Sequence, residues 1–333
     1  MENNKNVYDF VAIGDVVTEP FIRLIDAEAY CDLDQENCKL CMRFGDKIPY
    51  EHAEVCRAVG NSANAAVSAS RLGLKSALIS YIGDDEIGKG DLEELQKNNV
   101  STEYMRTIPG MPSNYHYVLW YGVERTILVK HTEFPYNLDM NMPAPKWIYL
   151  SSMAANSEQY HEQISQYIVA HPETKLAFQP GTFQMKLGVE KLKDIYKRSE
   201  IFFCNVEEAQ RILGVNEHDK KVLMNKLHDL GPKIIVMTDG IKGAYVRKED
   251  GKCYFMPVYP HTPKERTGAG DAFESTIVAA LALGKTLEEA MLWAPINAMA
   301  VTQEVGAQKG LLTREKLEEL LAKAPEDYKL KEI

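Results

Sequence analysis

The chain has 333 residues, of which 45% are hydrophobic and 26% are charged, as in globular enzymes that bury a large core. Its net charge of −10 and its pI near 5.4 argue against a nucleic-acid-binding protein, which usually presents a basic face. The sequence contains no apolar run of membrane-spanning length, and its N-terminus lacks the layout of a signal peptide, so we expect a cytoplasmic protein.

Strands and helices alternate in the N-terminal third of the chain, with one interruption. Residues 7–13 are a continuous apolar run that predicts a buried strand ending at Gly14. Residues 20–58 do not continue this alternation, and we expect them to form an appended element of short strands. A helix rich in small residues follows over 59–73, and a strand and a helix over 75–98 complete a βα unit.

The alternation resumes after a predicted hairpin at 113–131, whose two β-rich runs flank Gly122. We expect a helix over 185–196, and a kink or break where Pro295 interrupts a later helix. Repeated strand–helix units predict an α/β fold in a single domain, 1–333, with a central, mainly parallel β-sheet flanked by helices on both faces.

The segment 262–284 has the pattern of an anion-binding helix start. Gly268, Ala269 and Gly270 precede an apolar helix, so their N–H groups can bind an anion at the positive end of the helix dipole. Asp271 follows at once and places a carboxylate beside that anion. This arrangement suits phosphoryl transfer to a hydroxyl, with amides holding the phosphate and the acid taking the proton. It is also compatible with a plain glycine turn and an acid that only complements the dipole.

Four of the six cysteines fall within one short stretch, at Cys31, Cys38, Cys41 and Cys56. The two-residue gap between Cys38 and Cys41 suits tetrahedral thiolate ligation, so one interpretation is a structural zinc site. The other is a set of reduced structural or surface thiols, because six scattered cysteines are too few for a disulfide scaffold in a chain of this length.

Five motifs along the chain resemble the signatures of the ribokinase-like (PfkB) carbohydrate kinases and occur in the same order. They are the segments 60–64, 81–88, 205–208, 238–244 and 265–271. The resemblance spans about residues 7–322 and implies a ribokinase-like three-layer sandwich with a small β lid. The lid would lie at about 20–58, with the cysteine-bearing stretch as an insertion, and it would cover the sugar and mediate a homodimer.

The resemblance also assigns roles to single residues. Asp271 would be the general base that activates the acceptor hydroxyl, and the amides of Gly268, Ala269 and Gly270 would form the anion hole. Other residues would bind the nucleotide, namely Thr238, Gly240, Gly243, Asn205, Glu208, Thr267 and Asn297. A further set would bind the acceptor, namely Asp15, Glu19, Gly60, Asn61 and Asn64.

Three of these residues have structural alternatives. Asn205 and Glu208 would hold Mg²⁺ near the donor phosphates, largely through water, as suits an ion that keeps several waters. From the residues alone they are equally a helix N-cap and a first-turn acid. Asn297 would lie near the base of the nucleotide or occupy a plain position on a helix surface.

The chain departs from the family pattern around the catalytic motif. Glu19 stands where the family usually has an Asp that hydrogen-bonds substrate hydroxyls, and Val59 replaces the first glycine of a Gly-Gly pair. Glu265 and Arg266 replace the usual Asp-Thr, which leaves open whether a monovalent cation binds beside the anion hole. Gln179 stands where many members have Asp. The identity of the acceptor therefore stays open.

The function that the resemblance implies is an ATP- and Mg²⁺-dependent phosphotransferase acting on a hydroxyl of a sugar, expected to be primary. A nucleoside (adenosine-type) kinase of the same family is the nearest alternative. A non-catalytic sugar- or nucleotide-binding regulator is the alternative from another class. The expected partners are a small-molecule sugar or nucleoside and ATP, with neither nucleic acid nor membrane.

Overall fold

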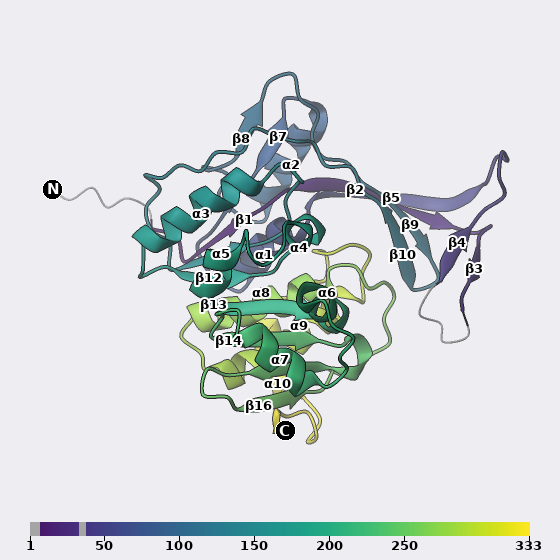
Figure 1. Cartoon of the computed structure of the whole chain (residues 1–333). Helices are drawn as coiled ribbons and strands as arrows, with labels where there is room; N and C mark the ends of the chain where they lie inside the picture. Colours follow the sequence, from purple (N-terminus) through teal and green to yellow (C-terminus); the bar gives the residue numbers. More distant parts are fainter. Residues whose placement is uncertain (1–6, 33–37) are drawn as a thin grey trace.

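A central β-sheet organises the computed structural model, which describes residues 7–32 and 38–333 (Figure 1). In these residues its strands are β1 (Phe10–Ile13), β6 (Ser76–Ile79), β11 (Trp147–Leu150), β12 (Lys175–Phe178), β13 (Ser199–Asn205), β14 (Ile234–Thr238), β15 (Ala244–Arg247), β16 (Cys253–Met256) and β17 (Lys331–Glu332). They lie in the order β17-β16-β15-β14-β13-β12-β11-β1-β6. The strands from β14 to β6 pair in parallel, whereas β15, β16 and β17 join in antiparallel pairing. The predicted α/β fold with a mainly parallel sheet is confirmed.

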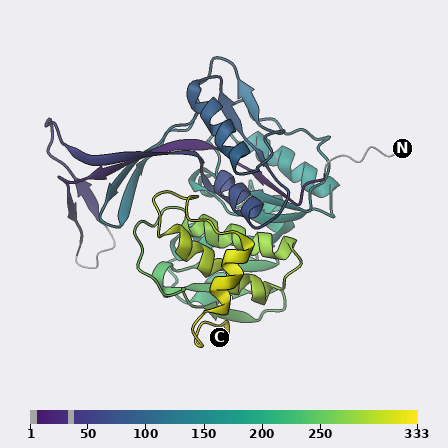
Figure 2. The same ribbon diagram turned by 180° about the vertical axis from the view of Figure 1, so that it is seen from behind.

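Helices cover both faces of the sheet, as Figures 1 and 2 show from opposite sides. One face carries α1 (Asn61–Arg71), α2 (Glu86–Lys97), α8 (Ala269–Ala282), α9 (Leu287–Val301) and α10 (Arg314–Ala322). The other carries α3 (Glu158–Ala170), α4 (Thr182–Leu187), α5 (Lys193–Arg198), α6 (Val206–Leu213) and α7 (Lys220–His228). Phe10 and Ala12 of β1 pack with the first set, and Val11 and Ile13 with the second, so the strand is buried on both sides. None of the helices in the described residues has the length and hydropathy needed to cross a bilayer.

A second sheet projects from the body as an arm (Figure 1, right). Its strands are β2 (Val17–Leu24), β5 (Tyr50–Val59), β9 (Tyr117–Tyr121) and β10 (Glu124–Leu128), and its far end carries the hairpin of β3 (Glu28–Tyr30) and β4 (Lys39–Cys41). We call these strands the lid. Their order is β10-β9-β2-β5, so the element expected at 20–58 shares one sheet with the hairpin that turns at Gly122. Further short elements are β7 (Tyr81–Gly83), β8 (Arg106–Ile108) and the 3-10 turn η1 (Gly240–Lys242).

Two helix predictions differ from the structure. The helix expected over 185–196 is two short helices, because α4 ends at Gly188 before α5 begins. We expected a kink or a break at Pro295, and the break does not occur because α9 continues through this residue. Trp293 and Ile296 on either side of the proline are fully buried, and this packing outweighs the hydrogen bond that a proline removes.

The structure does not gather the cysteines into the zinc site that the sequence left open. Cys31 and Cys38 form a disulfide bond, which also corrects the expectation of reduced thiols for this pair, whereas Cys41 and Cys56 are free thiols. Burial raises the pKa of Cys56 to about 12 and so disfavours the thiolate that zinc requires. In the described ranges, no three cysteine, histidine or acidic side chains converge on a candidate metal position.

Asp91 of α2 ties the root of the lid to the body. Its side chain is fully buried, and its Oδ1 accepts hydrogen bonds from Thr18 Oγ1 of β2 (2.6 Å) and from the N–H of Ala58 in β5 (2.8 Å). Ala58 has a φ of 52°, which alanine rarely adopts, and the contact with Asp91 helps to hold it there. Burial raises the pKa of Asp91 to about 6, so this carboxyl is protonated more readily in the folded chain than in the unfolded one.

The free energy of unfolding should therefore carry a pH dependence that Asp91→Asn removes. The folded state binds the extra proton below about pH 6, so stability falls as the pH rises from the ordinary aspartate pKa through this value. We expect the wild type to lose about 1 kcal/mol more than Asp91→Asn between pH 5 and pH 7, measured by urea denaturation. The exposed Asp194→Asn serves as the control and should follow the wild-type profile. Parallel profiles for wild type and Asp91→Asn would contradict the prediction.

Candidate functional site

Polar side chains meet where the parallel strands end at the carboxyl edge of the sheet. Asp15 follows β1, Gln179 follows β12, Asn205 ends β13 and Thr238 ends β14. In open α/β sheets, ligands bind at this edge. The first turn of α8 reaches the same place, because Gln179 contacts Asp271. We therefore take this edge of the sheet as the candidate active site.

The backbone N–H groups of Gly268, Ala269 and Gly270 open α8, and we call them the anion cradle. Gly268 is the N-cap with a φ of 76°, and the other two begin the helix. N–H groups in a first turn lack partners inside the helix, although that of Ala269 makes a long contact of 3.4 Å with the carbonyl of Arg266. A Cβ at Gly268 would lie 2.4 Å from the Cβ of Ala307, so this position requires glycine.

Three side-chain amides hold the carboxylate of Asp271 in the first turn of α8. Asn61 Nδ2 donates to Oδ1 (2.8 Å), Asn64 Nδ2 donates to Oδ2 (2.7 Å) and Gln179 Nε2 donates to Oδ1 (3.2 Å). Gln308 Nε2 donates to Asn64 Oδ1 at 3.0 Å, which fixes the orientation of that amide. The two asparagines thus orient a carboxylate that is distant in sequence, 210 residues after Asn61 and 207 residues after Asn64.

A buried carboxyl group lies behind Asp271. Glu274 is on the next turn of α8, and burial, together with the charges of Asp271 and Glu208, raises its pKa well above the ordinary range. Tyr149 OH donates to Gln179 Oε1 (2.8 Å) and lies 3.3 Å from Glu274 Oε2. This environment favours the protonated form of Glu274, which adds no negative charge next to Asp271.

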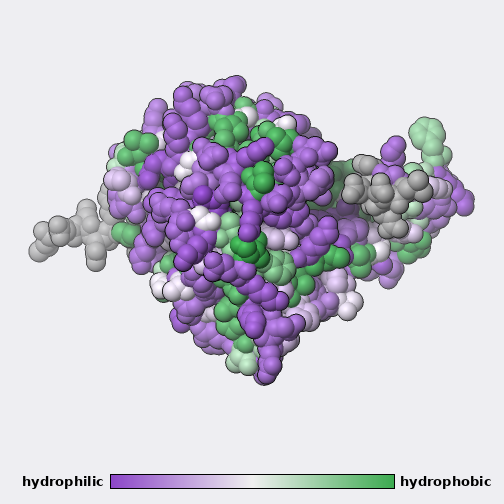
Figure 3. Space-filling view, turned by 60° about the horizontal axis from the view of Figure 1, so that its bottom comes forward, coloured by the Kyte–Doolittle hydropathy of each residue, from purple (hydrophilic) through white to green (hydrophobic). Residues whose placement is uncertain are grey.

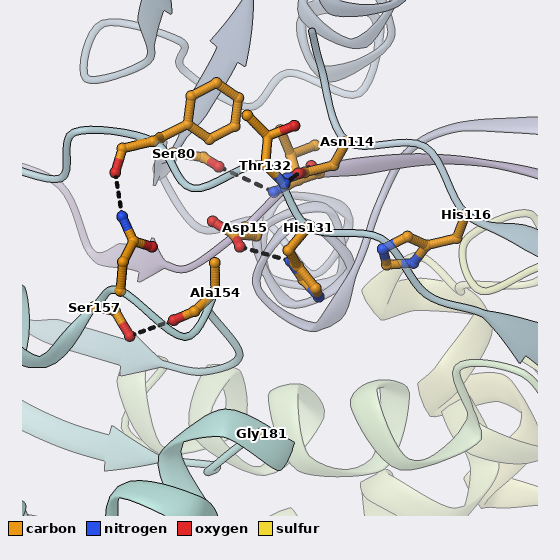
Figure 4. Close-up of polar contacts among 12 residues, drawn as sticks. Asp15, Ser80, Asn114, His116, His131, Thr132, Ala154, Ser157 and Gly181 are labelled. Atoms are coloured by element: carbon orange, nitrogen blue, oxygen red, sulfur yellow. Dashed lines mark hydrogen bonds and ion pairs between the residues drawn. The ribbon is translucent and has the colours of Figure 1, made fainter. Parts of the chain in front are cut away.

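Two histidine–carboxylate pairs lie at Asp15 and Glu19, and Figure 4 shows the first of them, between His131 and Asp15. His131 Nδ1 lies 2.8 Å from Asp15 Oδ2, and His116 Nδ1 lies 3.3 Å from Glu19 Oε1. Tyr136 OH donates to the other oxygen of Asp15 at 2.7 Å, and burial raises the pKa of this tyrosine. Asp15 and Glu19, which the sequence places near the acceptor, are therefore both buried and each is engaged by a histidine.

Gly60 lies between Asp15 and the helix α1, whose asparagines contact Asp271. It is the N-cap of α1, and a Cβ at this position would lie 2.8 Å from the carbonyl oxygen of Asp15. The close approach brings Asn61, the first residue of α1, next to the end of β1. Gly60 therefore acts through its backbone, by letting α1 start against β1.

The loop after β14 contains the residues that the sequence assigns to the nucleotide. Thr238 ends the strand, and the N–H of Asp239 donates to the carbonyl of Gly243 at 2.8 Å, which closes a tight turn containing Gly240. Gly240 and Gly243 leave two positions of this turn without side chains, whereas the side chain of Ile241 is exposed to solvent. This arrangement is compatible with the expected nucleotide contact.

Asn205 and Glu208 form a capping box at the start of α6, so the structural alternative for this pair is realised. Asn205 Oδ1 accepts the N–H of Glu208 (2.8 Å), and Glu208 Oε2 accepts the N–H of Asn205 (2.9 Å). Burial raises the pKa of Glu208, and the charges of Glu207 and Asp271 act in the same direction. Acids in such surroundings are stabilised by a cation, so capping and magnesium binding are compatible.

Asn297 is held inside the protein and not at a helix surface. It is fully buried, its Nδ2 donates to Thr276 Oγ1 (2.8 Å), and its Oδ1 accepts the N–H of Leu312 (2.9 Å). The surface position considered for it is therefore wrong. Because both ends of its amide are used, the structure favours a packing role over contact with the nucleotide.

Glu265 and Thr267 contact each other beside the anion cradle. Glu265 Oε1 accepts hydrogen bonds from the N–H (2.8 Å) and the hydroxyl (2.6 Å) of Thr267, so Thr267 orients this acid. Glu265 Oε2 is buried and has no hydrogen-bond partner in the part of the chain that the structure describes. A buried carboxylate oxygen without a partner is costly, and a cation would remove this cost.

Sequence reasoning missed several side chains of the site. These are His116, His131, Tyr136, Glu274 and Gln308. One signal was available, because Glu274 is a charged residue within an apolar helix and buried acids require a partner. The others lie in a hairpin or in loops, where the strand pattern says nothing about which distant carboxylate or amide they meet.

The family model described as pfkB family carbohydrate kinase matches residues 24–314. The chain belongs to this family. It is therefore a kinase, a phosphotransferase with an alcohol group as acceptor, and it binds ATP. The resemblance drawn from the five motifs is confirmed.

Relatives and solved structures agree with membership of the pfkB family. Ribokinase of Bacillus subtilis (strain 168) is 29% identical over 289 residues, which cover 79% of this chain and 87% of that protein. Probable fructokinase-5 of Arabidopsis thaliana is 26% identical, covering 76% and 85%. A putative ribokinase from Agrobacterium tumefaciens has a TM-score of 0.78 at 19% identity, covering 96% and 98%. Arabidopsis thaliana ribokinase complexed with ribose and ATP has a TM-score of 0.75 at 18% identity, covering 95% and 99%.

Gly268→Ala tests the steric constraint at the anion cradle. Left-handed backbone costs a non-glycine residue about 1–2 kcal/mol, and overlap with Ala307 adds about 1–3 kcal/mol, so we expect a lower free energy of unfolding by roughly 2–5 kcal/mol. Gly270→Ala is the matched control, because a Cβ there meets nothing within 4 Å. Its stability should change by less than about 1 kcal/mol. Urea denaturation measures both variants, and equal stability would show that the cradle does not require glycine at 268.

Proposed function

We propose that the protein is an ATP-dependent kinase that transfers the γ-phosphoryl group to a primary hydroxyl of a sugar. The observation that carries this proposal is the contact of Asp271 with Asn61 and Asn64 beside the anion cradle. This contact brings the carboxylate of Asp271 and the N–H groups at the start of α8 next to the residues expected to bind the acceptor. Solved structures that share the fold contain ribose with ATP, and ATP with Mg²⁺, which supports the same substrates here.

Asp271 would act as the general base. Its carboxylate would take the proton of the acceptor hydroxyl while that oxygen attacks the γ-phosphorus and the bond to the β-phosphate oxygen breaks, releasing ADP. The anion cradle would hold the negative charge of the transferring group at the positive end of α8. Gln179 and the two asparagines would keep the carboxylate in the geometry that this transfer needs.

Magnesium fits the Asn205–Glu208 pair on the nucleotide side. Burial raises the pKa of Glu208, and the charge of Asp271 acts in the same direction, so a cation beside Glu208 would stabilise its carboxylate. Asn205 and Glu208 would hold Mg²⁺ mainly through water. The ion would neutralise charge on the donor phosphates. A monovalent cation fits equally well at Glu265, whose Oε2 has no other partner among the described residues.

The lid would exclude water from the site. Phe21 and Trp120 of the lid pack in one cluster with Val305 of the body. Arg266 next to the anion cradle forms an ion pair with Glu124 of β10 at 2.6 Å. Contacts with the loop beside the cradle suggest that the lid closes over both substrates, which limits hydrolysis of ATP.

Asp271→Asn tests the assignment of the base. We expect kcat to fall at least about 100-fold, because the amide cannot take the proton. ATP binding, measured by calorimetry, should be retained because the anion cradle is unchanged. The assay measures ADP formation with D-ribose, D-fructose and adenosine as acceptors. A rate equal to that of the wild type would contradict the assignment, and Asp194→Asn at an exposed position serves as the control.

The outer face of the lid suggests a homodimer. Leu128, Tyr117 and Val55 lie on its neighbouring strands and are about half exposed, and Pro20 lies opposite Val55. Figure 3 shows hydrophobic surface along the projecting arm. Contiguous apolar patches are uncommon on monomers, and the face of one sheet can pair with the same face of a second copy about a twofold axis. We propose that a second copy of the chain covers this face.

Val55→Glu should weaken this dimer. A charge buried on the apolar face would raise the dissociation constant at least tenfold, which corresponds to about 1.4 kcal/mol of binding free energy. Val169→Glu on α3 is the matched control, because Val169 is also exposed but lies outside the lid. Sedimentation equilibrium measures the three proteins. A wild type that stays monomeric at micromolar concentrations, or equal dimerisation of all three, would rule out the lid interface.

A further inference from the structure

The two histidine–carboxylate pairs point to the class of molecule that is phosphorylated. We infer that the Nε2 atoms of His116 and His131 make hydrogen bonds to the acceptor, and that they select an uncharged polyhydroxy compound. This inference rests on the proposed kinase function and names the acceptor class of the same site.

A histidine stands at each of the two carboxylates. Asp15 binds His131 through Oδ2 and Tyr136 through Oδ1, at 2.8 and 2.7 Å. Glu19 binds His116 at 3.3 Å. Both acids are buried, with 5% and 7% of their surface exposed. Both oxygens of Asp15 and Oε1 of Glu19 thus contact protein groups, and each carboxylate carries an imidazole with a second nitrogen that can bind the acceptor.

The second nitrogen of each ring is available to a ligand. Each imidazole uses Nδ1 on its carboxylate, so Nε2 remains for another partner. His116 Nε2 is buried without a hydrogen-bond partner in the described part of the chain, a cost that a bound ligand would remove. The two ring centroids are 5.1 Å apart, and Phe183 of α4 lies 5.7 Å from His131. Figure 4 shows the two rings next to each other beside Asp15.

The position of the rings places them on the acceptor side. His131 touches Asp15 at the end of β1 and Phe183 in α4. The segment that leads into α4 contains Gln179, which donates to Asp271. The imidazoles and the expected base, Asp271, therefore lie at the same edge of the sheet. The imidazoles reach it from the two ends of the β9–β10 hairpin, and Asp271 reaches it from α8.

Charge at this side favours a neutral acceptor. Asp15, Glu19 and Asp271 contribute carboxylates, and in the described residues no lysine or arginine forms an ion pair with any of them. A hydroxyl can donate to a neutral Nε2 or accept from a protonated one, whereas a carboxylate or phosphate can only accept. An anionic acceptor would need both rings protonated and would still approach negative charges. Hydroxyl groups fit the site in either state of the rings.

Paired substitutions separate binding of the acceptor from support of the carboxylates. Asn places an amide near the position of Nδ1, and Gln places one near the position of Nε2. If His131 binds the acceptor, His131→Asn should raise the acceptor KM at least tenfold with kcat changed less than threefold, and His131→Gln should restore part of the loss. If the ring only supports Asp15, the order reverses. The same holds for His116 and Glu19.

A surface pair gives the matched control. His171 Nδ1 lies 3.3 Å from Glu173 Oε1 in a partly exposed histidine–carboxylate pair far from the sheet's carboxyl edge, so His171→Asn should leave the kinetic parameters unchanged. The KM for ATP should also stay within twofold in the His116 and His131 variants, because the anion cradle is separate. Thermal unfolding of each variant shows whether it has folded.

A set of acceptors tests the chemical class. D-ribose, D-fructose and adenosine are the neutral probes, and D-gluconate and D-fructose 6-phosphate are the anionic probes, with binding measured by calorimetry and turnover by ADP formation. We expect at least one neutral probe to bind at least tenfold more tightly than both anions. Tighter binding of an anion, binding of no neutral probe, or the reversed Asn and Gln order would overturn the inference. Neutral binding that depends on the histidines but gives no ADP would instead reject the kinase proposal.

Discussion

The hydrogen bonds from Asn61 and Asn64 to Asp271 are the constraint on which the rest of the site depends. They require the first turns of α1 and α8, from opposite ends of the chain, to meet at the carboxyl edge of the sheet. Glycines at the starts of both helices allow this approach, and Gln308 fixes the amide of Asn64 from a third segment. Asp271, the proposed base, is therefore positioned by long-range contacts and not by the local sequence of its own helix.

Several acidic side chains around Asp271 and beneath the lid are buried, which disfavours their charged forms. Asp91 beneath the lid, and Glu274 and Glu208 near Asp271, all have a raised pKa because the protein buries them. The charged form of each acid lowers the stability of the folded protein, so each is expected to be protonated or to lie beside a cation. A kinase that binds a polyanionic nucleotide together with Mg²⁺ has a use for such acids, since the ion and the phosphates change the local charge balance.

The sequence was sufficient for features that depend on local pattern. The parallel strands are continuous apolar runs, and the glycine turn before Asp271 indicated its own helix start, so the sheet and the anion cradle could both be predicted. The capping role of Asn205 and Glu208 could also be predicted, as an alternative to magnesium binding, because it depends on residues only three positions apart. Features set by tertiary contacts could not be predicted. The helix α9 continues through Pro295 because the residues around the proline are buried in the core. No pattern in the hairpin sequence showed that His116 would contact Glu19.

Cys56 occupies a revealing position in this architecture. Its sulfur lies where the lid meets the loop beside the anion cradle, and a Cβ at Gly306 would come within 2.5 Å of it. The thiol is half-buried at that junction and its pKa is raised, so both access and the small thiolate fraction slow its alkylation. If the lid separates from this loop, Cys56 becomes more exposed. Its alkylation rate, with and without substrates, would then report the movement of the lid in the native chain.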